Sequence, residues 1–250
     1  YDDIFVKENM IKVVGGTFTL GCNIGDSNCD RDEFPKKDVL ISSFYIQKNE
    51  VTNSQFLAFI NDYESDIVKE GEYRGKKMIY PSTSGLTKNK GAWSIKKGYE
   101  NHPVVDVTWF GAVTFAEYYG LRLPTEAEWE FVAKGGKSNH TYVFSGSNNL
   151  YNIGVYEGNS NFDSAIVGSK DNTHVLGVND MSGNVWEWCQ DWYSHNYDAS
   201  TSNPRGSKSG TTKLIRGGSY SEGEWEARVT NRAHKIPITH SNNIGFRCAK

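Results

Sequence analysis

The chain has 250 residues, of which 37% are hydrophobic and 23% are charged, and its formal net charge is −3. This composition is that of an ordinary folded protein, long enough for one large domain or two small ones. The mild charge gives no electrostatic footprint for nucleic acid, which would need clustered Lys and Arg. A run of about 18 apolar residues, as a membrane-spanning helix requires, is absent from the sequence.

The four cysteines do not form a metal-binding pattern. Cys22 and Cys29 lie close together in a loop rich in Gly, Asn and Asp, whereas Cys189 and Cys248 are far apart in sequence. No Cys-x-x-Cys motif or Cys/His cluster with zinc spacing is present. Cys22 and Cys29 could form a local disulfide or remain two free thiols, and the sequence leaves both possibilities open.

The first part of the chain predicts strands followed by a helix. Residues 11–21 and 39–47 alternate between apolar and polar side chains, as strands do. Thr52 and Gln55 form a capping box, which predicts the start of a helix. Residues 62–101 are rich in Lys, Gly and Ser, and we expect them to be a surface insertion within the domain.

Two more helices are expected in the middle of the chain. One begins at Thr108 and ends near Gly120, and the next begins at Thr125, which forms a capping box with Glu128. Residues 136–178 are dominated by Gly, Asn, Ser and Asp. Such a long irregular segment is unusual unless it is functional or held by something such as a metal ion.

The last third predicts short strands. Residues 185–189 alternate with period two, so Trp186 and Trp188 should share one face of a strand. Residues 213–216 and 244–248 predict two further strands. We therefore expect an α+β domain with low regular secondary structure and long ordered loops.

Four segments of the chain resemble the formylglycine-generating, sulfatase-modifying family, which is a branch of the C-type lectin fold. They are Asn49-Glu-Val-Thr-Asn53, Arg122-Leu-Pro-Thr-Glu-Ala-Glu-Trp-Glu130, Asp180-Met-Ser-Gly-Asn-Val-Trp-Glu-Trp188, and Arg216-Gly-Gly-Ser-Tyr220 with Gly245-Phe-Arg247. Their order and spacing match the family from near Gly15 to the C-terminus. The resemblance implies one domain of this fold over residues 1–250.

We interpret the family motifs as architecture. Trp129, Trp186 and Trp188 are expected to be core aromatics and not a stacking platform for a ligand. Glu126, Glu128 and Glu130 lie in the first turns of a helix, where carboxylates interact favourably with the helix dipole. A scaffold of this kind does not fix the function.

The resemblance implies an oxidase only where two cysteines follow the RGGS motif. Enzymes of the family look like copper-dependent oxidases that convert a cysteine of a sulfatase to formylglycine, and thiolates bind soft Cu(I). Residues 220–228 contain no cysteine. The six histidines are scattered, and the near neighbours His234 and His240 are expected to be surface residues. We therefore expect no catalytic residues and no copper.

The segment from Ser221 to Ser241 mixes residue types without periodicity, as binding loops on rigid scaffolds do. With its frame of RGGS, Arg-x-x-Asn-Arg and NNIGFR, it resembles the variable proteins of diversity-generating retroelements, a group that includes variable proteins of Treponema. In that group, codons of exposed residues are mutated at adenines and framework residues are retained. The resemblance makes region 216–250 a variable ligand-binding region with these candidate residues: Ser221, Glu222, Gly223, Glu224, Trp225, Ala233, His234, Lys235, Ile236, Ile238, Thr239, His240 and Ser241.

The expected ligand is a protein or a glycan on another cell. Trp225, His234 and Ile236 are the candidate anchors, because a few central residues usually carry most of the binding energy. Trp225 could instead belong to the core. By resemblance we expect a location at the cell surface or outer membrane, with a lipid anchor outside this chain. An oxidase relative that has lost its cysteines and a structural accessory domain are the alternatives.

The family resemblance also implies structural calcium, which prefers carboxylate and carbonyl oxygens. Gly183, Asn184, Val185 and Glu187 match one such site. A weaker match is Asn152 and Ile153, with Asn161 or Asp163. The alternative for Glu187 is a buried carboxylate that accepts hydrogen bonds from backbone amides.

Overall fold

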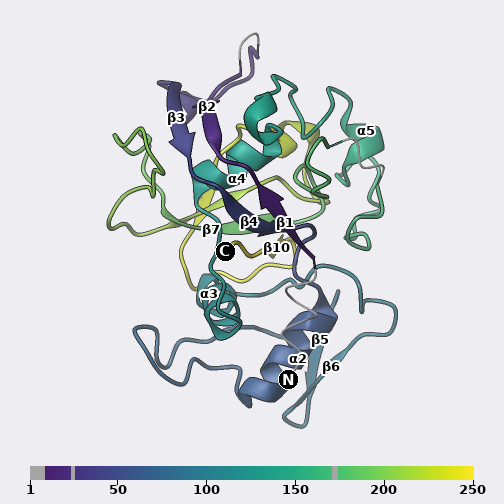
Figure 1. Cartoon of the computed structure of the whole chain (residues 1–250). Helices are drawn as coiled ribbons and strands as arrows, with labels where there is room; N and C mark the ends of the chain where they lie inside the picture. The colour runs from purple at the N-terminus through teal and green to yellow at the C-terminus, as the bar shows by residue number, and fades with distance from the viewer. Residues whose placement is uncertain (1–8, 24–25, 171–173) are drawn as a thin grey trace.

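The computed structural model describes residues 9–23, 26–170 and 174–250, and has mixed α and β structure with long loops (Figure 1). The strands are β1 (Met10–Val13), β2 (Gly16–Leu20), β3 (Lys37–Ile41), β4 (Phe44–Gln47), β5 (Leu86–Asn89), β6 (Ala92–Ile95), β7 (Trp186–Trp192), β8 (Lys213–Arg216), β9 (Ala233–Lys235) and β10 (Ile244–Gly245). The helices are α2 (Asn53–Tyr63), α3 (Trp109–Tyr118), α4 (Glu126–Ala133) and α5 (Leu150–Ile153), with 3₁₀ turns η1 (Arg31–Glu33), η2 (Gly136–Ser138) and η3 (Glu224–Ala227). Within the described ranges, no helix combines the length and apolar character needed to cross a bilayer.

The three longer helices begin where their capping residues predict. The Thr52 and Thr125 side chains each accept a hydrogen bond from the backbone N–H three residues on. In turn, the Gln55 and Glu128 side chains accept from the backbone N–H of Thr52 and Thr125. Thr108 caps α3 in the same way, without the return bond. Local side-chain chemistry therefore sets these helix starts.

The two N-terminal strands predicted by alternation are each split in two. Residues 11–21 were expected to form one strand, but β1 pairs with β4 and β2 pairs with β3. The strand is interrupted around Gly15, where an added Cβ would lie 2.3 Å from the carbonyl oxygen of Ile41. On either side of this point the chain belongs to different ladders, and the strand expected at 39–47 is divided in the same way between β3 and β4.

Four strands of the C-terminal part of the chain form one sheet, in the order β10-β7-β8-β9. The Trp186 and Trp188 side chains enter the core cluster of α2 and α3, whereas Cys189 enters the cluster of α4. The predicted face assignment of β7 is therefore confirmed, as is the burial of both tryptophans and of Trp129. The closing strand is shorter than predicted, because β10 has two residues, and β9 has no counterpart among the predicted strands.

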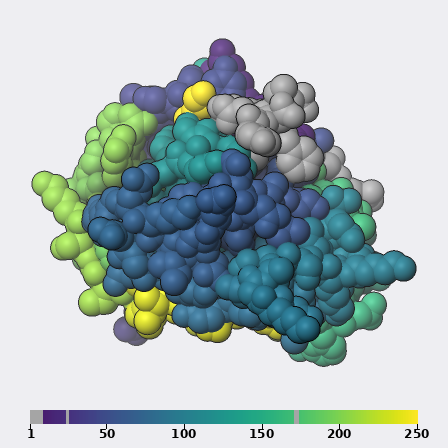
Figure 2. All heavy atoms as spheres, turned by 90° about the horizontal axis from the view of Figure 1, so that it is seen from below, coloured from purple at the N-terminus to yellow at the C-terminus, as the bar shows by residue number. Residues whose placement is uncertain are grey.

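The segment 62–101 is only partly superficial. It carries the β5–β6 hairpin, and in the space-filling view residues of α2 and this segment cover much of one face (Figure 2). Met78, Ile79 and Leu86 are nevertheless fully buried in the cluster that holds Trp188. The segment thus closes one side of the core.

Buried ion pairs join α4 to the strands and loops that follow it. Glu130 accepts from Arg216 Nη2 at 2.6 Å and forms an ion pair with Lys134 at 2.8 Å. Glu126 accepts from Arg232 Nε at 2.6 Å and Nη2 at 2.9 Å. The helix-dipole interpretation of Glu126 and Glu130 is therefore incomplete: both carboxylates are buried partners of arginines that lie 86 to 106 residues later in the chain.

Asp191, on β7, is a buried carboxyl beside this network. Its Oδ2 accepts from the backbone N–H of Glu126 at 2.9 Å. Burial, reinforced by the Glu126 carboxylate, raises the pKa of Asp191 from 3.8 to about 8. The folded protein therefore holds a proton on Asp191 through the range in which the unfolded chain has released it.

The raised pKa predicts that Asp191 reduces stability as the pH rises from about 4 to about 8. In this window the folded state binds one more proton than the unfolded state, which contributes a slope of about 1.4 kcal/mol per pH unit. Asp191→Asn should remove this contribution and flatten the dependence of the free energy of unfolding on pH, as measured by guanidinium titrations at pH 5, 6, 7 and 8. The exposed-site control Glu70→Gln should keep the wild-type slope, and an unchanged slope in Asp191→Asn would contradict the assignment.

Candidate functional site

The C-terminal region divides into buried framework residues and exposed residues. Arg228, Asn231 and Arg232 are buried, with 8% exposure or less. All thirteen candidate ligand-binding residues, by contrast, are exposed or half-buried. This pattern follows the division that the sequence predicts, with the arginine and asparagine frame inside and the residues between them at the surface.

Arg228 is anchored by the N-terminal loop from Cys22 to Glu33. Its guanidinium donates to both Glu33 oxygens, at 2.8 and 3.2 Å, and to Asp26 Oδ2 at 3.3 Å. Cys22 and Cys29 form a disulfide that closes this loop, which decides between the two possibilities left open by the sequence.

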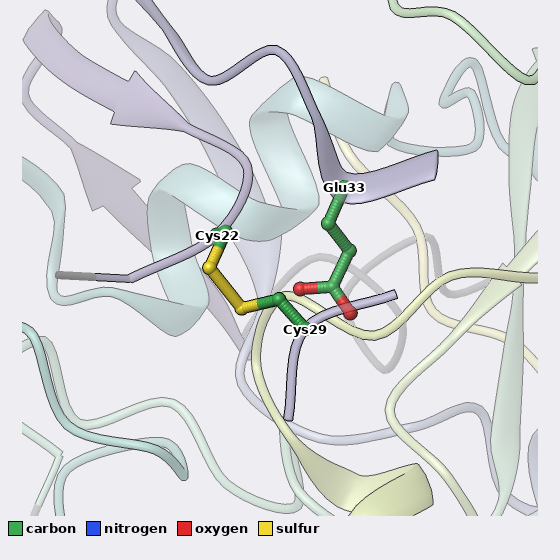
Figure 3. A group of neighbouring side chains, drawn as sticks. All are labelled: Cys22, Cys29 and Glu33. Atoms are coloured by element: carbon green, nitrogen blue, oxygen red, sulfur yellow. A yellow bond between two sulfur atoms is a disulfide. The ribbon is translucent and has the colours of Figure 1, made fainter. Parts of the chain in front are cut away.

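Figure 3 shows the disulfide with the Glu33 carboxylate beside it. Among the described His, Cys, Asp and Glu side chains, these three are the group whose ligand atoms come together closely enough to hold a metal. Their sulfurs are bonded to each other and the Glu33 oxygens are bound by Arg228. The Glu33 carboxylate is thus committed to Arg228, and the disulfide lies next to that carboxylate.

Arg232 is fixed by further long-range contacts, and Asn231 by local ones. Besides Glu126, Arg232 Nη1 donates to the backbone carbonyls of Asp32 at 2.7 Å and His195 at 3.3 Å. The Asn231 amide donates to the Glu226 backbone and carboxylate at 3.0 and 2.8 Å. The two arginines therefore tie the C-terminal region to other parts of the fold, and Asn231 holds the chain around η3 together.

Two candidate residues stack on tyrosines outside the region. The His234 ring lies 3.9 Å from that of Tyr193, and the His240 ring lies 3.8 Å from that of Tyr80. Burial lowers the pKa of His234. The tyrosines were not identified from the sequence, because nothing local marks a residue as the neighbour of a segment so far along the chain.

Glu222 differs from the other candidates because it supports the fold. Its carboxylate accepts from the indole N–H of Trp186 and from Ser219 Oγ at 3.1 Å. Burial raises the pKa of Glu222. Ser221 is linked through Asn243, whose amide donates to the hydroxyls of Ser219 and Ser221 at 3.1 Å. A substitution at Glu222 would leave the indole N–H without its acceptor.

The large apolar candidates point outward. Trp225 is 52% exposed, Ile236 49% and Ile238 57%. The structure thus answers the question left open for Trp225, which does not belong to the core. These side chains are available at the surface for contact with another molecule.

The Glu187 carboxylate is engaged by an arginine and an indole. Arg247 donates to its two oxygens through Nη2 and Nε, each at 2.7 Å, and Trp129 Nε1 donates at 2.8 Å. The buried-carboxylate alternative is therefore closer to the structure, although the donors are side chains and not backbone amides. The neighbouring Val185 N–H and Asn184 amide donate to Glu50.

The weaker calcium match is spread over several elements. Asn152 and Ile153 lie on α5, where Ile153 is buried in an apolar cluster. Asp163 lies in the following loop and accepts from the Tyr99 hydroxyl and the Ser164 N–H. Asn161, two residues before Asp163, has a left-handed backbone conformation. Both calcium sites remain predictions.

The chain's cysteines lie outside the stretch that follows RGGS. The pair that exists, Cys22–Cys29, is the disulfide beside Arg228. Cys189 and Cys248 are buried free thiols, and burial raises the pKa of each.

Comparison with known proteins supports the resemblance seen in the sequence. The FGE-sulfatase family model, described as a sulfatase-modifying factor enzyme 1-like domain, matches residues 4–250. The formylglycine-generating enzyme of Streptomyces coelicolor is 31% identical over 96% of this chain and 88% of its own length. The protein named inactive C-alpha-formylglycine-generating enzyme 2 of Mus musculus is 29% identical over 96% and 85%. The relatives thus include both enzymes and a protein named inactive.

Other relatives are much longer than this chain. Serine/threonine-protein kinase Pkn1 of Chlamydia trachomatis is 35% identical over 96% of this chain, but the match spans only 38% of the kinase.

Two solved structures share the fold along almost the whole chain. Treponema denticola variable protein 1 matches with a TM-score of 0.71 and 24% identity over 96% of this chain and 94% of that one. PvdO from Pseudomonas aeruginosa matches with a TM-score of 0.78 and 23% identity over 96% and 93%. The fold is the predicted C-type lectin fold of the formylglycine-generating type, and the chain belongs to the FGE-sulfatase family of sulfatase-modifying factor enzyme 1-like domains.

Proposed function

We propose that this chain is a non-enzymatic ligand-binding protein whose C-terminal region, residues 216–250, is diversified as in retroelement variable proteins. The observation that carries the proposal is the division of this region. Its framework arginines are buried in ion pairs, whereas the residues between them are exposed or half-buried. Exposed positions away from special contacts usually tolerate substitution within about 0.5 kcal/mol. Such a surface can change in sequence without loss of the fold.

The distribution of thiols supports a role without copper chemistry. Residues 220–228 hold no cysteine. The Cys22–Cys29 sulfurs are bonded to each other, and Cys189 and Cys248 are buried in apolar clusters. Since a thiolate is needed to bind soft Cu(I), none of these cysteines offers an accessible ligand in the folded protein.

The exposed side chains favour a macromolecular ligand. Trp225, Ile236 and Ile238 offer apolar contact area, and the stacked His234 adds a flat polar surface. We propose a protein ligand, or a glycan, on another cell. The chain would be displayed at the cell surface or outer membrane by a lipid anchor outside this sequence.

We also propose calcium near Gly183, Asn184, Val185 and Glu187. After burial itself, the Asp180 and Glu187 carboxylates help to raise the pKa of Glu50, and Glu187 helps to raise that of Asp180; the Arg247 guanidinium lies against Glu187. Burial raises the pKa of Asp180 to about 6 and that of Glu50 well above its usual value. An ion here would have to take over oxygen atoms that now accept hydrogen bonds from Arg247, Trp129 and Asn184, and calcium prefers such carboxylate and carbonyl oxygens. The ion would hold the loops around β7 and would be structural.

The proposal predicts opposite responses at framework and surface positions. Arg228→Met leaves the Glu33 carboxylate buried without its partner, and we expect a loss of about 3–5 kcal/mol in the free energy of unfolding. Ile238→Ser and Thr239→Asn should change it by less than about 0.5 kcal/mol. Urea titrations of the three variants measure these differences. Similar losses at all three positions would mean that the exposed residues are part of the scaffold.

The proposal also predicts natural variation in the sequence of the C-terminal region. Sequencing the 3′ end of the gene across a clonal culture and related isolates should show substitutions confined to residues 221–241, at codons that are mutated at their adenine positions. Arg216–Ser219 and Gly245–Arg247 should be unchanged. A uniform segment would overturn the proposal, and changes spread evenly along the chain would favour an ordinary scaffold domain.

Calcium should stabilise the chelator-treated protein. A ligand that binds only the folded state at about 100 times its Kd contributes about 2.7 kcal/mol, so Tm should rise by a few degrees on adding calcium. Magnesium should have a smaller effect, because it demands more regular octahedral geometry. Asp180→Asn should reduce the calcium-dependent rise. An equal Tm with and without calcium would exclude the ion from this site.

A further inference from the structure

Three exposed aromatic side chains lie on neighbouring segments at one end of the C-terminal region. Phe162 is 73% exposed and Tyr151 is 60% exposed, and Trp225 is the third. Tyr151 lies on α5 and Trp225 on η3, and these two elements pack together, because Ala227 of η3 shares a buried cluster with Leu150 and Ile153 of α5. Two of the three rings therefore lie outside the region proposed to vary.

The loop that carries Phe162 is bonded to the start of the same region. The Glu157 N–H donates to the Glu222 carbonyl at 3.0 Å, and Ser160 Oγ donates to the Tyr220 carbonyl at 2.7 Å. These bonds use the backbone of the C-terminal region, so they do not depend on which side chains occupy it. The loop accordingly keeps its place beside a surface whose side chains change.

Phe162 is presented in a costly conformation. Its φ is +60°, in the left-handed region that a large side chain rarely adopts. The Phe162 N–H donates to Ser160 Oγ at 3.0 Å, and the next residue, Asp163, accepts from the Tyr99 hydroxyl. The bonds on both sides hold an apolar ring in solvent, where it contributes little to the core.

The surroundings of the aromatic rings are acidic. Glu157, Glu224 and Glu226 are exposed on the same segments. One cation is already near: Lys170 Nζ lies 5.8 Å from the centre of the Tyr151 ring. Aromatic faces and carboxylates both attract ammonium and guanidinium groups. The charge of the patch therefore complements a basic partner.

We propose that Tyr151, Phe162 and Trp225, with Glu157, Glu224 and Glu226, form an aromatic-acidic rim that docks a basic polypeptide segment of the ligand. The inference rests on the proposed function and deepens it, since it assigns part of the ligand surface to residues outside 216–250. The rim supplies affinity that is common to all variants of the chain, and the exposed residues of the variable region supply specificity.

The test selects peptides from a random dodecapeptide phage library on the wild-type chain and measures synthetic copies of the enriched peptides by fluorescence anisotropy. We expect the peptides to be rich in Lys and Arg, and their affinity to fall with rising salt. Phe162→Asn should weaken binding about tenfold. Asn suits a left-handed backbone better than Phe does, so this variant removes the ring without disturbing the loop. Glu157→Gln combined with Glu224→Gln should weaken binding by a similar factor.

Tyr45→Ser, at an exposed aromatic residue of β4, is the matched control and should bind as the wild type does. Ile238→Ser tests the variable surface separately. If binding is lost in Ile238→Ser but unchanged in Phe162→Asn, the rim is overturned and the proposed function stands. If binding is lost only in Phe162→Asn, the rim stands and the variable surface fails. Enriched peptides without basic residues, or no enrichment, overturn the rim as a site for basic polypeptide.

Discussion

The fold depends on arginines of the C-terminal region that are buried against carboxylates from earlier parts of the chain. Arg216 and Arg232 pair with Glu130 and Glu126 of α4, and Arg228 pairs with Glu33. A buried ion pair is weak evidence for net stability, but removing one partner is expensive because the other charge stays buried. Each pair therefore acts as a constraint on position, and it admits few other arrangements of these segments.

This constraint separates the scaffold from the surface. The buried arginines fix the backbone on either side of η3 and before β9. The exposed side chains in this region therefore contribute little to holding the backbone in place. Guanidinium groups suit the role because they make several directed hydrogen bonds at once; Arg232, for example, donates to the Glu126 carboxylate and to two backbone carbonyls. Glu222 is an exception among the candidate residues, because its carboxylate accepts from Trp186 and so cannot be replaced as freely as the others.

The parts of this structure that could be predicted from the sequence are those set by local chemistry. Thr52, Thr108 and Thr125 mark the helix starts through bonds to residues three positions away. The partners of Glu126 and the stacking of His234 on Tyr193 depend on contacts between residues far apart in sequence, which one sequence does not reveal. β9 was missed for the same reason, because its three residues form a strand only through pairing with β8.

The family includes proteins named formylglycine-generating enzyme and one named inactive, and the same separation shows how both can share one scaffold. The stretch in which the resemblance places the copper-binding thiols, residues 220–228, begins beyond Arg216 and consists mostly of exposed or half-buried residues before Ala227. Its side chains from Ser221 to Trp225 stand outside the ion pairs that hold the fold. Cysteines could be exchanged there without unpairing a buried charge. Active and inactive relatives could then differ in one exposed segment on a scaffold whose stability does not depend on it.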